Sequence, residues 1–315
     1  MYKINLGIIG TSLIAEEHLK VLNKLNKFKI YGITSRTNKN SKKLAHKFSI
    51  NIIYKNYIDM VKDPNIDVLL VLVSADQIYK VINDIIPYKK PFFTEKPPGL
   101  SLDQASKLVK KWKKFKTLNM VGFNRRFYSV FHKGMEYINK KGKLIGLAIE
   151  GHERFWLLKN IKKKYLLRNW IYANSSHTID LIRFFGGEVK KINSHVNNFL
   201  SSQNNQISSS FILESGCVGS YQSHWLSPGG WSVKLYGEGV TVDFKPLEKG
   251  ILINNKFKKK IIEPDKYDIM FKPGFYQQMI SFQKMIEKQK KVWPAQDLSD
   301  SLKTMKLIKN IADGS

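Results

Sequence analysis

Two short segments of the chain carry residue types that suit phosphate binding and proton transfer. Gly10-Thr11-Ser12-Leu13-Ile14-Ala15 follows an apolar run and has the spacing of a glycine-rich turn that opens a helix. Such a turn points backbone N–H groups at a pyrophosphate, and the helix N-terminus favours negative charge. Thr94-Glu95-Lys96-Pro97 follows a later apolar run. A phosphate cradle and a lysine at the edge of one sheet predict a nicotinamide enzyme that acts on a hydroxyl or carbonyl group.

The glycine-rich turn departs from the G-x-G-x-x-G/A pattern at one position. Gly10 supplies the tight turn and Ala15 the close contact between helix and strand, whereas Ser12 replaces the middle glycine. We therefore expect the phosphate to sit slightly further out, with the Ser12 hydroxyl as a donor. An ordinary turn between a strand and a helix is the alternative. The predicted cofactor contacts in this turn are Gly10, Thr11, Ser12, Leu13 and Ile14.

The residues after the second apolar run bear on the choice between NAD and NADP. NAD enzymes usually place Asp or Glu there, where it binds the ribose hydroxyls. This chain has Ser35 followed by Arg36. A carboxylate would repel a 2′-phosphate, whereas a hydroxyl and a guanidinium hold one by charge-assisted hydrogen bonds. The sequence predicts a preference for NADP, and the alternative is that Arg36 stacks on adenine and either cofactor binds.

Two residues are candidates for handling the proton in such a reaction. Lys96 can hold or polarise the reacting oxygen, and His177 titrates near neutrality and can exchange the proton. The alternatives are a solvated surface lysine and a structural histidine. A metal is not expected, because the seven histidines are scattered and none forms a ligand pair with Cys217.

The elements that must position these residues alternate over the first 120 residues. Apolar runs typical of buried strands alternate with stretches of helical periodicity. Because these strands are apolar throughout, we expect a parallel sheet covered on both sides, which is the doubly wound α/β (Rossmann) architecture. The predicted strands are 4–9, 30–34, 68–73, 92–94 and 119–122, and the predicted helices are 14–25, 39–48, 77–86 and 101–112.

The pattern changes after residue 122. Helices are predicted at 128–140, 176–185, 271–288 and 297–311, and short alternating strands at 147–150, 209–213, 218–225, 232–236 and 240–244. The last two strands are joined by a hairpin turn at Gly237-Glu238-Gly239. The sequence thus predicts a Rossmann domain over residues 1–122. Residues 123–315 are predicted to form an α+β domain on a mostly antiparallel, open-faced sheet, with C-terminal helices able to pack back on the first domain.

Four motifs, in this order, resemble the Gfo/Idh/MocA family of NAD(P)-dependent oxidoreductases. They are Glu95-Lys96-Pro97 after a strand, Gly122-Phe123-Asn124-Arg125-Arg126-Phe127 at the domain junction, His177-Thr178-Ile179-Asp180 opening a helix, and the Gly237 hairpin. The combination is specific, although each motif alone is not, and it covers nearly the whole chain. The resemblance implies hydride transfer between a nicotinamide and a sugar, cyclitol or nucleotide-sugar. It also implies a homodimer or homotetramer formed through the open sheet face.

The resemblance assigns further residues to the site. It implies that Lys96 contacts both the nicotinamide and the reacting hydroxyl. Glu153, Arg154 and Trp156 follow a predicted strand and are further candidates for the substrate region. The implied cofactor residues are Ser74, Ala75, Gln77, Tyr79, Glu95 and Asn124, and the implied substrate residues are Arg126, Arg168, Trp170 and His177.

One position departs from the family pattern. Members with a Lys–Asp–His arrangement carry Asp four residues before the His, and this chain has Ala173 there, followed by Asn174. An amide cannot act as a base, so this segment offers no aspartate relay. Two alternatives follow: a glycoside-cleaving enzyme that holds NAD tightly, and a nucleotide-binding homologue without turnover.

Composition narrows the compartment and the partners. The run 68–73 is too short to span a bilayer, the first strand begins too early for a secretory signal, and Cys217 is the only cysteine. We therefore expect a cytoplasmic protein without membrane insertion. The formal net charge of +28 suits either a polyanionic partner or a lysine-rich solvated surface. Because the lysines are spread along the chain, we expect a sugar-like small molecule and not nucleic acid as the partner.

Overall fold

The chain folds into two compact units. The computed structural model describes residues 3–158, 160–198 and 205–314. One unit comprises residues 1–124 and 270–302, and the other comprises residues 125–269 and 303–315. The first unit therefore receives a helix from late in the chain, α11 (Phe275–Lys288), which packs against its first helix.

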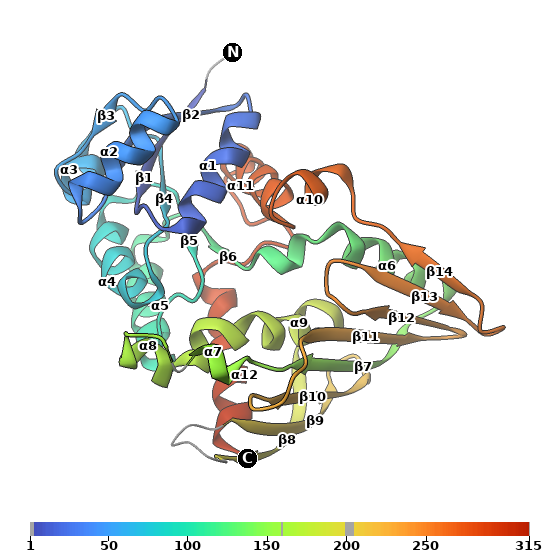
Figure 1. Cartoon of the computed structure of the whole chain (residues 1–315). Coiled ribbons are helices and arrows are strands. Elements are labelled where there is room, and N and C mark those ends of the chain that lie inside the picture. Colours follow the sequence, from blue (N-terminus) through green and yellow to red (C-terminus); the bar gives the residue numbers. More distant parts are fainter. Residues whose placement is uncertain (1–2, 159, 199–204, 315) are drawn as a thin grey trace. The chain divides into compact units, whose positions relative to one another are not determined.

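The first unit is built on a six-stranded parallel sheet (Figure 1). The strand order is β3-β2-β1-β4-β5-β6, so the order reverses between β1 and β4. This order confirms the doubly wound sheet predicted from the apolar runs. The strands are β1 (Ile4–Ile9), β2 (Phe28–Thr34), β3 (Ile52–Ile53), β4 (Val68–Val71), β5 (Phe92–Glu95) and β6 (Asn119–Gly122).

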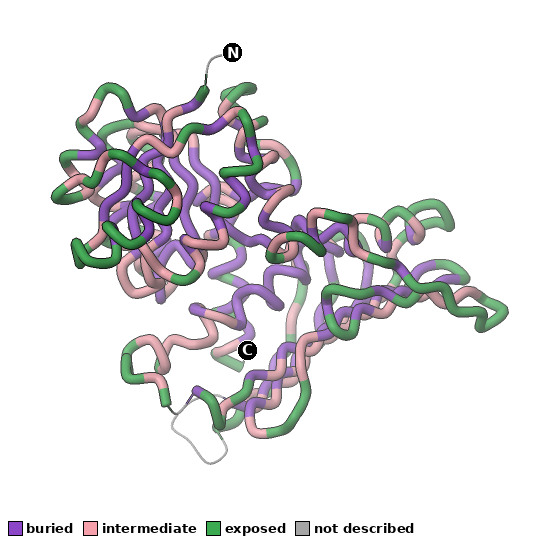
Figure 2. The backbone as a smooth tube through the Cα atoms, turned by 45° about the horizontal axis from the view of Figure 1, so that its top comes forward, coloured by how far each residue is buried: buried purple, intermediate pink, exposed green. Residues whose placement is uncertain are grey.

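Helices cover the first sheet, and their ends follow local sequence signals. Ser101 caps α5, because its Oγ accepts a hydrogen bond from the Gln104 N–H at 3.2 Å, and Asn56 caps α3 in the same way at 2.9 Å. The strands β4, β5 and β6 are buried throughout, and Figure 2 shows the buried strands in the interior of this unit. The helices are α1 (Leu13–Lys24), α2 (Asn38–Lys47), α3 (Tyr57–Lys62), α4 (Ala75–Ile85) and α5 (Leu102–Phe115), with 3-10 turns at Ile86–Tyr88 and Asn124–Phe127.

The second unit is built on an eight-stranded mixed sheet. Its order is β14-β13-β12-β11-β7-β10-β9-β8, and every neighbouring pair is antiparallel except β7 and β10. The mostly antiparallel sheet is therefore confirmed, as is the hairpin at Gly237. The strands are β7 (Leu144–Gly151), β8 (Val189–Asn197), β9 (Gln206–Leu213), β10 (Val218–His224), β11 (Trp231–Gly237), β12 (Val240–Phe244), β13 (Gly250–Asn254) and β14 (Lys259–Ile262).

Two helices of the second unit cover one face of its sheet. The Phe131 ring of α6 lies 5.1 Å from Phe185 of α9 and 4.9 Å from Phe244 of β12, so the two helices and the sheet share one aromatic core. The α12 helix begins in the first unit and ends in the second. The remaining helices are α6 (Ser129–Lys141), α7 (Phe155–Leu158), α8 (Lys164–Arg168), a π-helical turn (Ile171–Ser175), α9 (Ser176–Gly186), α10 (Lys266–Met270) and α12 (Leu298–Asp313).

The opposite face of this sheet carries no helix in the part of the chain that the structure describes. Tyr236 pairs across strands with Gly146, Gly146 with Val218, and Val218 with Ile212, so these residues form one row on that face. Its large side chains are exposed: Ile212, Val218, Tyr236, Ile251 and Ile261. This row gives the face a flat, partly apolar surface.

Both edges of the second sheet are rich in lysine. Lys190 and Lys191 are exposed on β8, and Lys259 and Lys260 are exposed on β14. Charged residues on edge strands oppose pairing with another chain. Among the described residues, no helix has the length and apolar character needed to cross a bilayer.

Candidate functional site

The carboxyl ends of β1, β4 and β5 bring the first group of predicted site residues to one edge of the first sheet. Ile9 pairs with Val71, and Val71 pairs with Thr94. The residues that follow these three, including Gly10 and Lys96, therefore leave the sheet at the same edge. In doubly wound sheets, ligands bind at this edge and near the point where the strand order reverses.

The turn at Gly10 fits the approach of a pyrophosphate. Gly10 has φ +115°, and a Cβ built on it would lie 2.5 Å from the Leu72 carbonyl oxygen, so only glycine is accommodated. The α1 helix begins three residues later, and its first N–H groups have no acceptor within the helix. Leu13 is 89% exposed, so this turn is open to solvent. The donor set therefore suits an anion bound at the N-terminus of α1.

The hydroxyl of Ser12 is engaged differently from the sequence expectation. Its Oγ donates to the Leu72 carbonyl oxygen at 3.0 Å. The hydroxyl proton is thus directed at the β4 backbone, and it is not available as the phosphate donor that the sequence suggested. The hydrogen bond fixes the turn against the neighbouring strand, which leaves the backbone N–H groups as donors.

The residues that discriminate NAD from NADP lie where β2 leads into α2. The Ser35 Oγ donates to the Thr37 carbonyl oxygen at 2.9 Å and lies 2.7 Å from the Ser41 Oγ. These contacts place Ser35 in the turn before α2. The Arg36 side chain is exposed. The guanidinium is accessible to a ligand, whereas the Ser35 hydroxyl already stabilises the local turn.

A second helix begins at the same sheet edge. Ser74 is the N-cap of α4, and Ala75 is its first residue. The Gln77 amide donates to the Asp76 carboxylate at 3.0 Å, and the half-buried Tyr79 ring packs against the apolar core. The N-termini of α1 and α4 thus follow neighbouring strands, and Ser74, Ala75 and Gln77 lie at the start of the second helix.

Lys96 and Glu95 are adjacent in sequence, but their surroundings differ. Lys96 is half-buried and its peptide bond to Pro97 is cis. Glu95 is buried, with its Oε1 2.7 Å from the His18 Nε2. The Glu95 carboxylate therefore faces the interior of the first unit and not a cofactor. Asn124 is buried, and its amide donates to the Pro273 carbonyl oxygen at 3.0 Å.

The second unit contains a cavity of about 560 Å³ at the end of β7 and the start of β11. Two tryptophans and several polar side chains form its wall. The Trp170 indole Nε1 is buried and donates to no atom of the described residues. Aromatic faces suit the C–H faces of sugar rings, and the polar groups suit hydroxyls. The wall includes His152, Glu153, Arg154, Trp170, Asn174 and Trp231.

Glu153 is the buried carboxylate of this cavity, with 5% of its surface exposed. Its Oε1 accepts hydrogen bonds from the Ser175 Oγ at 2.8 Å and the Asn174 Nδ2 at 3.1 Å. Its Oε2 accepts from the same Asn174 amide at 2.9 Å. Both donors lie in the π-helical turn before α9, so Asn174 and Ser175 orient Glu153. A carboxylate has about four acceptor positions, so room remains for a ligand hydroxyl.

His177 lies behind the wall of the same cavity. It is 6% exposed, and its ring centroid is 6.0 Å from that of Trp231, which lines the cavity. The Arg125 guanidinium lies 4.4 Å from the centroid of the Trp231 ring. This cation–π contact and the neighbouring His177 ring restrict the orientation of the indole.

His152 enters the cavity wall in a defined tautomer. The His224 backbone N–H donates to the His152 Nδ1 at 3.0 Å, so the proton of the neutral ring resides on Nε2. Burial lowers the pKa of His152 below its usual range. His152 can therefore donate a hydrogen bond through its Nε2–H, whereas its Nδ1 lone pair already accepts one from His224.

Comparison with known proteins relates the first unit to a known protein family. A family described as "Oxidoreductase family, NAD-binding Rossmann fold" (GFO_IDH_MocA) matches residues 4–123. The N-terminal domain is therefore similar to the Gfo/Idh/MocA family over these residues. The match contains the Gly10 turn and Lys96, and it ends at Phe123. The resemblance inferred from four motifs is thereby confirmed.

Relatives and solved structures extend the comparison to other proteins. The myo-inositol 2-dehydrogenase of Thermotoga maritima is 27% identical over 135 residues, which cover 43% of this chain and 40% of that protein. The chain spans about two fifths of the curated relatives it matches first. A levoglucosan dehydrogenase in complex with NADH and levoglucosan has TM-score 0.85 at 13% identity, covering 99% of this chain and 97% of that one. An oxidoreductase from Agrobacterium radiobacter in complex with NAD⁺, L-tartaric acid and magnesium has TM-score 0.84 at 15% identity, covering 99% and 96%. These two structures show that the whole chain shares the fold.

Some residues that the sequence predicts for the substrate region have other environments. Arg126 is 5% exposed and forms a bidentate ion pair with Asp180, with Nε–Oδ2 2.7 Å and Nη2–Oδ1 3.0 Å. This buried pair links the 3-10 turn after β6 to α9 and gives Arg126 a structural contact. Arg168 is exposed at the end of α8 and does not line the cavity. Ala173 is buried in the π-helical turn.

Several cavity residues carry only weak signals in the amino-acid sequence. Glu153 was a candidate because it follows a strand, but its two donors are separated from it by more than 20 residues. Trp231 and His152 received no role, because single aromatic or histidine residues without a motif are more often structural. Among the described residues, no group of three metal-binding side chains lies together.

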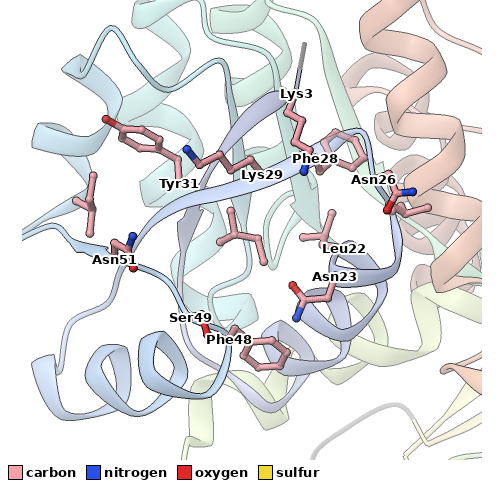
Figure 3. Close-up of a pocket in the computed structure, with 13 residues that line it drawn as sticks. Lys3, Leu22, Asn23, Asn26, Phe28, Lys29, Tyr31, Phe48, Ser49 and Asn51 are labelled. Atoms are coloured by element: carbon pink, nitrogen blue, oxygen red, sulfur yellow. The ribbon is translucent and has the colours of Figure 1, made fainter. Parts of the chain in front are cut away.

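A separate cavity of about 320 Å³ lies at the other edge of the first sheet (Figure 3). Phe28, Lys29 and Tyr31 line it from the start of β2, and Asn23 and Asn26 line it near the end of α1. Because dinucleotides bind at the carboxyl ends of the strands, this cavity is in the wrong place for the cofactor.

Proposed function

We propose that the protein is an NAD(P)-dependent oxidoreductase that transfers hydride between a nicotinamide and a hydroxyl or carbonyl of a sugar or cyclitol. The observation that carries the proposal is the shared sheet edge of the Gly10 turn and Lys96. The relatives named for inositol and levoglucosan dehydrogenation support the substrate class.

The cofactor would supply hydride transfer, and the chain would bind it and manage the proton. We assign the pyrophosphate to Gly10, Thr11 and the N–H groups that open α1, with Ser74, Ala75 and Gln77 beside it. Lys96 would hold the reacting oxygen, since an ammonium stabilises developing negative charge on that oxygen. His177 would exchange the proton with the substrate hydroxyl.

The substrate would occupy the cavity of the second unit. Trp170 and Trp231 offer aromatic faces to the ring, and Glu153 offers a free acceptor position to a hydroxyl. The Nε2–H of His152 would donate to a substrate oxygen. This assignment replaces Arg126 and Arg168 as substrate contacts, because one is in a buried ion pair and the other lies outside the cavity.

We propose NADP as the preferred cofactor. The exposed Arg36 guanidinium supports this choice, because it can bind a 2′-phosphate and no acidic residue occupies the adjacent position 35. Ser35 supports it less, since its hydroxyl is bound within the turn. Binding of NAD with Arg36 stacked on the adenine remains the competing arrangement.

The first experiment is a titration with NADPH and NADH, followed by turnover with a panel of cyclitols and sugars. Lys96→Met should abolish turnover while leaving cofactor binding largely intact, and Lys113→Met, on the exposed face of α5, serves as the control. Unchanged turnover in Lys96→Met would contradict the assigned role. Glycoside cleavage without net cofactor reduction would favour the alternative reaction, and cofactor binding without turnover would favour a binding protein.

We also propose that copies of the chain associate through the open face of the second sheet, in the cytoplasm. Exposed Val218, Ile212 and Tyr236 on one cross-strand row support association, because apolar side chains gain free energy on burial. The single cysteine supports a reducing compartment. Tyr236→Lys should shift the sedimentation coefficient toward the monomer.

A further inference from the structure

A buried histidine–carboxylate pair lies directly before Lys96 and has no part in the proposed reaction. His18 of α1 is fully buried, and its Nε2 lies 2.7 Å from the Glu95 Oε1. Glu95 is 8% exposed and is the last residue of β5. The pair therefore ties the middle of the first helix to the residue that precedes the proposed reacting lysine.

The surroundings of His18 are apolar and restrict its ring. Its centroid lies 4.5 Å from that of Phe275 and 5.1 Å from that of Phe93. The His18 Nδ1 is buried and has no hydrogen-bond partner among the residues that the structure describes. The ring is thus held by two aromatic contacts and one polar contact, which is the contact with Glu95.

Such a pair is a poor way to stabilise a core. Removing charged or polar groups from water costs free energy, and replacing buried ion pairs by apolar residues is often neutral or stabilising. The aromatic rings near the pair form one cluster, in which the centroid of the Phe93 ring lies 5.8 Å from that of Phe282. A leucine at position 95 would suit these neighbours better, so stability alone does not explain the pair.

The direction of the β5 side chains shows what the pair determines. Phe93 and Glu95 are two residues apart and both contact His18, so they point to the same face of the sheet. Lys96 follows in sequence and is half-buried at the carboxyl edge. Fixing Glu95 on the α1 face therefore fixes the backbone from which Lys96 departs.

We propose that the His18–Glu95 pair is a positioning device that sets where Lys96 is held at the sheet edge. His18 and Glu95 are positioning residues, and neither touches the reacting atoms. The inference rests on the proposed function for its catalytic consequence, but the placement of Lys96 can be measured without any substrate. Glu95 is thereby reassigned from cofactor contact to support of its neighbour.

The test replaces the pair without emptying the core. His18→Phe/Glu95→Leu exchanges both partners for apolar residues. A purely structural role of the pair predicts that the double variant folds and that the reactivity of its Lys96 is unchanged. Glu95→Gln is the conservative variant, because its amide oxygen can still accept from the His18 Nε2. Phe282→Leu is the matched control, since it truncates the same core without touching the pair.

The primary readout is the rate at which an amine reagent, trinitrobenzenesulfonate, modifies Lys96, measured by peptide mass spectrometry over a range of pH. The exposed Lys113 in the same sample is the internal reference. In the double variant, we expect the modification rate of Lys96 to approach that of Lys113. In Glu95→Gln and Phe282→Leu, we expect the modification rate of Lys96 to equal that in the wild type. Thermal unfolding verifies that the double variant is folded.

A second readout separates this inference from the proposed function. With a cyclitol substrate and NADPH, we expect kcat of the double variant to fall by about 100-fold, as for a misplaced catalytic group, with little change in cofactor affinity. Equal Lys96 reactivity in the wild type and a folded double variant would overturn the inference. Altered Lys96 reactivity in the double variant, together with no turnover by the wild type, would uphold the positioning and refute the proposed function alone. If the double variant does not fold, the reactivity of Lys96 in His18→Gln decides, and wild-type behaviour there overturns the inference.

Discussion

Replacing Gly10 by alanine should damage both the stability of the first unit and its ability to bind a dinucleotide. The backbone at Gly10 has φ +115°, a region that side chains other than glycine rarely adopt, and this costs about 1–3 kcal/mol. The new Cβ would lie 2.5 Å from the Leu72 carbonyl oxygen and 2.8 Å from the Val73 nitrogen. Because these are backbone atoms of the neighbouring segment, they cannot move aside cheaply, and overpacking adds about 1–3 kcal/mol.

Gly187→Ala measures the cost of the positive φ alone, without a steric clash. Gly187 has φ +87°, but a Cβ there would meet no atom within 4 Å. We therefore expect Gly187→Ala to lower the free energy of unfolding by about 1–3 kcal/mol, and Gly10→Ala by about 2–6 kcal/mol. Hydrogen exchange measured by mass spectrometry over a urea series reads these changes separately in the two units. NADPH titration completes the assay, with an expected loss of affinity of at least about tenfold for Gly10→Ala only.

Two results would refute this reasoning. If Gly10→Ala destabilised the first unit no more than Gly187→Ala destabilises the second, the contact with Leu72 would not be limiting. If Gly10→Ala bound NADPH as the wild type does, the turn would not be the pyrophosphate site.

Further substitutions test other parts of the structure. Arg36→Ala should weaken NADPH binding by about tenfold and leave NADH binding unchanged in fluorescence titrations, because only NADPH carries the 2′-phosphate; equal losses would indicate stacking on adenine. Glu153→Gln should raise KM for a cyclitol with little effect on cofactor affinity, and an unchanged KM would place the substrate elsewhere. Arg126→Met should lower the free energy of unfolding in urea by about 3–5 kcal/mol, because it leaves the buried Asp180 carboxylate without its bidentate partner. A loss below about 1 kcal/mol, which is typical of a surface ion pair, would show that Asp180 finds other partners. Burial lowers the pKa of His132, so the unfolded chain binds its proton first as the pH falls. The contribution of His132 to the free energy of unfolding is therefore intact above the unfolded pKa of about 6.5 and is lost toward lower pH. Between pH 7 and 5, His132→Gln should lose less of its free energy of unfolding than the wild type does. An identical pH dependence of the two proteins would show that His132 does not contribute.

Much of the fold could be predicted because its signals are local. The apolar runs at 4–9 and 68–73 matched β1 and the region of β4 closely, since strands buried on both faces consist mostly of apolar residues. The helix predicted at 176–185 corresponds to α9, which ends at Gly186. Short elements were missed: β3 has two residues, and α7 and α8 have four and five, which is too few for a period to show.

The site was less predictable because its contacts join distant parts of the chain. The sequence identified Glu95 by its motif, but only the structure shows the contact with His18, 77 residues earlier. Arg126 was selected as a charge near the substrate, whereas it pairs with Asp180, 54 residues later. The direction of a side chain depends on the neighbouring strands and helices, and a motif does not record those neighbours.

The lysines at the two edges of the second sheet limit how copies of the chain can join. A sheet with bare edges can accept a strand from another copy at each end, and repetition of that step produces a fibre. Lys190 and Lys191 on β8 and Lys259 and Lys260 on β14 place like charges where such strands would meet. Growth along the hydrogen-bonding direction is therefore opposed at both ends, and the flat face with Val218 offers contacts that end once it is covered. The edge lysines, which contribute to the large positive charge, therefore oppose extension of the sheet into a fibre.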